Sequence, residues 1–102
     1  MLTIDLLKDG RQGCKIVGEV DVATASPFRD ALEQAVDSGA KEIFLDISDM
    51  EYIDSTGIGI LIDMKKNIME PDQEFVLIHP KRSIAKLFQL TGVDQIFRIV
   101  EA

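Results

Sequence analysis

Apolar and polar residues alternate over the first twenty positions of the chain in a pattern typical of two strands. Leu2 to Leu7 is apolar with Thr3 and Asp5 interspersed, which indicates a half-buried strand. Residues 8–10, Lys-Asp-Gly, are a turn signal, and Gly13 to Val20 has the composition of a second strand. Together the two segments predict a β-hairpin.

A helix is predicted after the hairpin. Ser26 is a favourable N-cap residue, and Pro27 suits the first helical position because its fixed φ matches the helix. Apolar residues then recur at helical spacing to about Ser38, and Gly39 suits the position just after a helix end.

The rest of the chain continues to alternate between strand-like and helix-like segments. The predicted elements are a strand over 42–47, a loop over 48–54, a helix over 58–69, a strand over 74–79, a helix over 84–90 capped by Ser83, and a strand over 95–100. The order β-β-α-β-α-β-α-β predicts an α/β fold with a mixed sheet. We expect an antiparallel hairpin, later strands each parallel to the one before, and helices mainly on one face.

Composition narrows the possible functions. A length of 102 residues favours one domain over 1–102. Eleven Lys and Arg residues against eighteen Asp and Glu residues give a net charge of −7, which argues against surfaces for nucleic acid or anionic membrane. With Cys14 and His79 as the only residues of their types, we expect no disulfide within the chain, no metal site and no cofactor. The absence of a signal-peptide pattern favours the cytoplasm.

The segment Asp54-Ser55-Thr56-Gly57-Ile58-Gly59 lies between a strand and a helix, where ligands gather in open α/β sheets. The N–H groups of a helix N-terminus favour an anion, so a hydroxyl there can carry a phosphate. A second interpretation is that Ser55 or Thr56 is only an N-cap and that the glycines form a tight turn. Two glycines in a first turn weaken a helix, each by about 1 kcal/mol relative to alanine.

The helix predicted over 58–69 has an unusually wide apolar face. Its apolar residues cover an arc of about 200°, whereas a surface helix needs little more than about 100°. Either this helix is deeply buried, or the edge that carries Ile60 and Met64 is a surface for a partner.

Four segments together resemble the pattern of bacterial anti-sigma factor antagonists, which are small single STAS domains. They are Leu45-Asp46-Ile47-Ser48, Tyr52-Ile53-Asp54-Ser55-Thr56-Gly57-Ile58-Gly59-Ile60-Leu61, Gly18-Glu19-Val20-Asp21 before a helix begun by proline, and Leu87-Phe88-Gln89-Leu90-Thr91-Gly92-Val93. The resemblance extends over nearly the whole chain and implies a STAS-like fold.

The resemblance also implies a cycle of partner switching. The unphosphorylated antagonist binds an anti-sigma factor, a serine kinase with a GHKL-type ATP site, and so releases a sigma factor. The kinase phosphorylates the serine of the motif, here Ser55, and a PP2C-type phosphatase removes the phosphate. Thr56 is a possible second acceptor, but the match to the family favours Ser55.

Residue roles follow from the same resemblance. Asp54 and Asp21 are expected to help the kinase place Ser55 or its metal. The glycines are expected to permit close approach of the partner protein, and the apolar residues to make contact with it. The expected partner-binding residues are Asp21, Asp54, Thr56, Gly57, Ile58, Gly59, Ile60 and Met64. A phosphate on Ser55 adds about −1.5 to −2 charges beside Asp54, which would repel an acidic partner surface.

Two alternatives use the same residues differently. Ser55, His79 and an aspartate could nominally form a catalytic triad, but no Gly-x-Ser-x-Gly motif is present, so we expect no enzyme. The chain could instead be a STAS scaffold or ligand-binding module in a larger sensing complex.

Overall fold

Six strands form one mixed sheet in the computed structural model, which describes residues 1–101. The elements are β1 (Leu2–Leu6), β2 (Gly13–Val20), α1 (Ala25–Asp37), β3 (Glu42–Asp46), β4 (Met50–Ile53), α2 (Ser55–Asp63), the π-helical turn η1 (Met64–Ile68), β5 (Glu74–Ile78), α3 (Arg82–Thr91), the 3₁₀ turn η2 (Val93–Gln95) and β6 (Arg98–Val100). No helix within residues 1–101 is long and apolar enough to cross a membrane.

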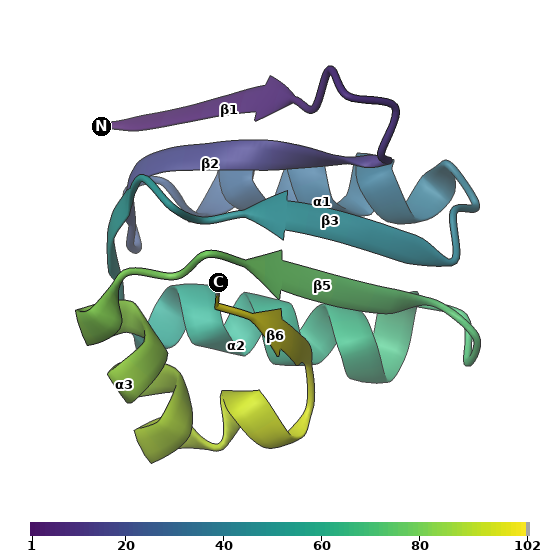
Figure 1. Cartoon of the computed structure of the whole chain (residues 1–102). Coiled ribbons are helices and arrows are strands. Elements are labelled where there is room, and N and C mark those ends of the chain that lie inside the picture. The colour runs from purple at the N-terminus through teal and green to yellow at the C-terminus, as the bar shows by residue number, and fades with distance from the viewer. Residues whose placement is uncertain (102) are drawn as a thin grey trace.

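The sheet confirms the predicted fold class. Its main strand order is β1-β2-β3-β5-β6, with β1 antiparallel to β2 and the other neighbours parallel. Helices α1 and α2 lie side by side behind the sheet, and α3 packs at its end, against β4 (Figure 1). Apolar residues of β2, β3 and β5 alternate toward the helices, and the core forms between these layers.

Strand β4 lies where the sequence predicted a loop over 48–54. It pairs in parallel with the second part of β2, Gly18–Val20, whereas β3 pairs with the first part, Gly13–Lys15. Its end residues Met50 and Ile53 are buried, but the two residues between them are exposed. A strand this short gives too little alternation for its sequence to be distinguished from a loop.

The predicted caps Ser26 and Ser83 each lie two positions after the N-cap that the structure shows. Helix α1 begins at Ala25 after Thr24, whose hydroxyl donates to the carbonyl of Glu19 at 2.9 Å, so the preceding turn sets the helix start. Helix α3 begins at Arg82 after an extended Lys81 and has no side-chain cap.

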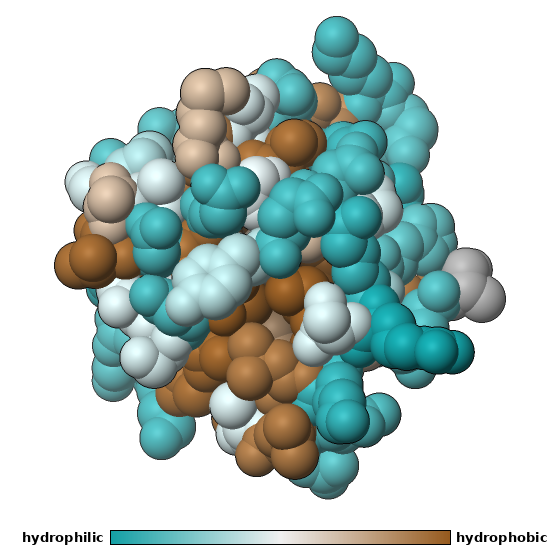
Figure 2. Space-filling view, turned by 90° about the vertical axis from the view of Figure 1, so that its left-hand side faces the viewer, coloured by the Kyte–Doolittle hydropathy of each residue, from teal (hydrophilic) through white to brown (hydrophobic). Residues whose placement is uncertain are grey.

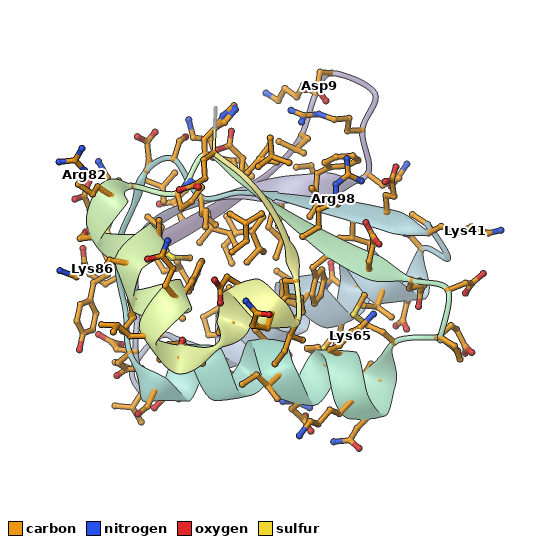
Figure 3. The ribbon with its side chains drawn as sticks, turned by 60° about the horizontal axis from the view of Figure 1, so that its bottom comes forward. Asp9, Lys41, Lys65, Arg82, Lys86 and Arg98 are labelled. Atoms are coloured by element: carbon orange, nitrogen blue, oxygen red, sulfur yellow. The ribbon has the colours of Figure 1, made fainter. Side chains whose placement is uncertain are left out.

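Gln73 is the one buried polar residue within residues 1–101. Its Nε2 donates to the carbonyls of Val36 at 3.1 Å and Ala40 at 2.9 Å, and its Oε1 accepts from the amide of Glu70 at 2.9 Å. From η1, the ammonium of Lys65, which is labelled in Figure 3, donates to the Gln73 carbonyl at 2.9 Å. These bonds join the end of α1 to the loop before β5.

Replacing Gln73 by methionine should therefore destabilise the fold. Methionine fills similar volume but satisfies none of these groups, so we expect a loss of about 1–3 kcal/mol in the free energy of unfolding. Urea unfolding measures this loss. The control Gln89→Met changes an exposed glutamine of α3 and should shift the free energy by less than about 0.5 kcal/mol. Equal effects of the two changes would contradict the structural role of Gln73.

Candidate functional site

Parallel pairing of β2 with β4 brings Asp21 and Asp54 to the same end of the sheet. Val20 and Ile53 are register partners, and the Asp54 amide donates to the Val20 carbonyl at 3.1 Å. Because Asp21 and Asp54 each follow one of these paired residues, they leave the sheet side by side.

Asp54 is the N-cap of α2. Its Oδ1 accepts hydrogen bonds from the amides of Thr56 at 2.9 Å and Gly57 at 3.3 Å. The interpretation of Ser55 or Thr56 as the cap is therefore wrong, because the aspartate carboxylate already occupies these N–H groups. The positive end of the helix thus holds an anion of its own.

Ser55 is the first residue of α2, and its side chain is exposed. Within residues 1–101, the side-chain hydrogen bonds of this turn run to Asp54, and none holds the Ser55 hydroxyl. Thr56, the second possible acceptor, is half-buried. The geometry therefore makes Ser55 the more accessible hydroxyl, and within residues 1–101 no hydrogen bond joins it to His79 or to a carboxylate.

Asp21 is fixed by a turn of its own. Its Oδ1 accepts from the amides of Ala23 at 2.9 Å and Thr24 at 3.1 Å, and its amide donates to the Thr24 hydroxyl at 2.9 Å. Asp21 and Asp54 thus each use Oδ1 to hold backbone within this part of the chain. Asp46 is used in the same way, since its Oδ1 accepts from the amide and hydroxyl of Ser48.

The two glycines of the motif face opposite environments. A Cβ on Gly57 would lie 2.6 Å from Cγ1 of Ile53 and 2.7 Å from Cγ1 of Val20, closer than atoms can pack. A Cβ on Gly59 would point into open space. Gly57 therefore permits close approach of α2 to its own sheet rather than to a partner, and Gly59 alone leaves room on the surface.

The apolar edge of α2 belongs to the core. Met64 is 0% exposed, and Ile58 and Ile60 are buried. The prediction that Ile58, Ile60 and Met64 contact a partner is therefore wrong, and deep burial explains the wide apolar arc. Residues that remain available around Ser55 are Asp21, Asp54, Thr56 and Gly59.

Comparison with known proteins identifies the family. The STAS domain family model matches residues 6–102. The chain belongs to the STAS domain family. An anti-sigma-B factor antagonist of Staphylococcus aureus is 28% identical to it over 87 residues, which cover 85% of this chain and 81% of that protein. The resemblance to bacterial anti-sigma factor antagonists is therefore confirmed.

Solved structures share the fold of this STAS domain. An anti-sigma factor antagonist from Mycobacterium paratuberculosis superposes with a TM-score of 0.83 at 22% identity, over 100% of this chain and 86% of that chain. The Bacillus cell fate determinant SpoIIAA in its phosphorylated form gives a TM-score of 0.64 at 19% identity, over 98% and 91%.

Two exposed apolar residues at the same end of the STAS domain were missed from the sequence. Tyr52 in β4 is 50% exposed, and Val22, just after β2, is 79% exposed. Figure 2 views this end and shows apolar surface gathered on its lower half, where α2 and α3 lie.

Charged residues surround the apolar surface. Glu51 in β4 pairs with Lys81 at 3.6 Å, while Arg82 and Lys86 extend from α3 into solvent (Figure 3). Lys15 pairs with Asp49 at 2.9 Å and lowers the pKa of that carboxyl. Within residues 1–101, no group of three or more histidine, cysteine, aspartate or glutamate side chains is arranged to hold a metal ion.

Alanine substitutions at the two glycines should have opposite effects on stability. Gly57→Ala forces Ile53 and Val20 apart and should lower the free energy of unfolding by about 1–3 kcal/mol. Gly59→Ala meets no atoms and should raise it by up to about 1 kcal/mol, because alanine favours the helix. Thermal and urea unfolding measure both. If Gly57→Ala were as stable as Gly59→Ala, the close packing of α2 would not constrain this position.

Proposed function

We propose that this STAS domain is an anti-sigma factor antagonist controlled by phosphorylation of Ser55. The observation that carries the proposal is the exposed Ser55 hydroxyl at the start of α2, beside the fixed carboxylates of Asp54 and Asp21. The names of related proteins support the class of function, since the Staphylococcus relative is an anti-sigma-B factor antagonist. The phosphorylated form of SpoIIAA supports the modification.

In the proposed cycle, the unphosphorylated domain binds an anti-sigma factor in the cytoplasm and so releases a sigma factor. The anti-sigma factor is a serine kinase with a GHKL-type ATP site, and it transfers the γ-phosphoryl group of ATP to the Ser55 Oγ. The hydroxyl proton leaves, and ADP departs with the bridging oxygen. A PP2C-type phosphatase hydrolyses the phosphate. The domain itself acts as substrate and ligand, without catalytic activity of its own.

Electrostatic repulsion is the proposed switch. A phosphate brings about −1.5 to −2 charges at neutral pH to a surface that already carries Asp54 and Asp21. Ser55 is exposed, so the phosphate needs no rearrangement of the core. Repulsion and steric bulk at the contact would cost a few kcal/mol of binding free energy. This cost would weaken binding to the anti-sigma factor by roughly 10²-fold. Thr56, Gly59, Tyr52 and Val22 are the proposed neutral contacts around Ser55.

The acceptor assignment predicts a simple phosphorylation pattern. Incubation with the cognate kinase and ATP should add one phosphate to the wild type, and peptide mass spectrometry should place it on Ser55. Ser55→Ala should take up none, whereas Thr56→Val, which removes the neighbouring hydroxyl, should be phosphorylated normally. Phosphate on Thr56, or its uptake by Ser55→Ala, would refute the assignment.

The repulsion mechanism predicts different affinities for two isosteric variants. Ser55→Asp adds one charge and should weaken binding to the kinase by about 10- to 10²-fold, as measured by calorimetry. Ser55→Asn adds the same bulk without charge and should bind within a few-fold of the wild type. Equal weakening by both variants would show that bulk, and not charge, controls the contact.

A further inference from the structure

The edge of the sheet opposite β6 has an apolar groove that lies away from Ser55. It lies between β1 and α1 and has a volume of about 580 Å³. Its lining is mostly apolar and includes Leu2, Ile4 and Leu6 of β1, Cys14 of β2, and Pro27 and Ala31 of α1. Leu6 is 80% exposed, although it lies on the side of the sheet that α1 covers elsewhere. Burial raises the pKa of the Cys14 thiol to about 11, so the side chain is neutral at physiological pH.

The free edge of β1 exposes a regular set of backbone groups. The Leu7 amide donates to the Gly13 carbonyl at 3.1 Å, and the Glu19 amide donates to the Met1 carbonyl at 3.2 Å. Odd-numbered residues of this segment therefore direct their backbone groups toward β2. Because backbone direction alternates along an antiparallel strand, Leu2, Ile4 and Leu6 direct theirs outward, away from the sheet.

We propose that this edge binds a second copy of the chain through antiparallel pairing of β1 with β1. In this arrangement Ile4 lies on the two-fold axis opposite the partner's Ile4, and Leu2 lies opposite the partner's Leu6. Each of these pairs exchanges two hydrogen bonds, so the outward N–H and C=O groups of all three residues are satisfied. The two sheets then form one continuous sheet.

Charge disfavours one neighbouring register. A shift to the register that pairs Ile4 with the partner's Leu6 would place Asp5 opposite the partner's Asp5, and like charges directly opposite each other are destabilising. The proposed register places Asp5 opposite the partner's Thr3, which is uncharged. A strand from a different protein would need the same alternation of outward backbone groups and apolar side chains. A second copy has this alternation because its β1 has the same sequence.

The direction of the side chains also favours pairing of β1 with the β1 of a second copy. Leu2, Ile4 and Leu6 all face the groove, so pairing brings the apolar side chains of both copies together on one face of the joined sheet. The exposed Leu6 gains the partner's Leu2 as its neighbour, and the two grooves become one mostly apolar layer between the two α1 helices, with Asp30 and Gln34 also in its lining. In Figure 1, β1 forms the upper edge, while α2 and α3 lie in the lower half of the view, so the start of α2, where Ser55 lies, remains open.

Sedimentation velocity over a range of protein concentrations tests the proposal. The wild type should show a concentration-dependent shift from monomer to dimer. Leu6→Lys puts a charge opposite the partner's Leu2 and should raise the dimer dissociation constant by about tenfold or more. Leu90→Lys is the matched control, because Leu90 is 76% exposed on α3, far from this edge, and it should leave the dissociation constant unchanged. Far-ultraviolet circular dichroism should show that both variants are folded.

Cysteine cross-linking tests the register. Two strands paired at Ile4 hold their Cα atoms about 5.5 Å apart, within disulfide range. In oxidised glutathione, and with Cys14, the register partner of Leu6, replaced by serine in both variants, Ile4→Cys should form a disulfide-linked dimer, and Leu6→Cys should not, because its neighbour is the partner's Leu2. A wild type that stays monomeric, equal effects of Leu6→Lys and Leu90→Lys, or faster cross-linking of Leu6→Cys would each overturn the proposal.

Discussion

The structure depends on one strand, β2, being shared between two parallel neighbours. Its first part pairs with β3 and its last part with β4, so the chain leaves the sheet after β3 and returns to the same side of β2. The bond from the Asp54 amide to the Val20 carbonyl closes this arrangement. Through it, the turn held by Asp21 and the cap held by Asp54 become neighbours, although they are far apart in the sequence. Without β4, α2 would have no fixed starting point.

Close packing then makes the starting point rigid. Gly57 allows the first turn of α2 to rest directly on Val20 and Ile53, the paired residues at the ends of β2 and β4. Ser55 lies on the opposite, exposed side of that turn. A modification there changes the charge of the surface while the core behind it keeps its packing. The energetic cost of glycine in a helix is thus offset by packing at Gly57, whereas Gly59 has no such compensation within residues 1–101.

The sequence was sufficient to predict the order of the elements other than β4 and the two short turns, the antiparallel hairpin and the parallel crossovers, because apolar spacing differs strongly between strands and helices. It also located the Asp54–Gly59 motif. It failed at β4, where two of four residues are exposed, and at Ser26 and Ser83, where turns formed by other residues set the helix starts. The burial of Met64 in the core could not be predicted, because the sequence pattern of an apolar helix face is the same whether the chain's own core or a partner covers that face.

The two proposed surfaces are geometrically compatible because of strand direction. The Ser55 site lies at the carboxyl ends of β2 and β4, whereas the proposed dimer forms along the side of β1. Antiparallel pairing of two β1 strands turns the parallel strands of one copy opposite to those of the other. The two Ser55 sites then point in opposite directions along the joined sheet. A kinase bound at one site would therefore approach neither the second site nor its phosphate, and each copy could switch independently of its partner.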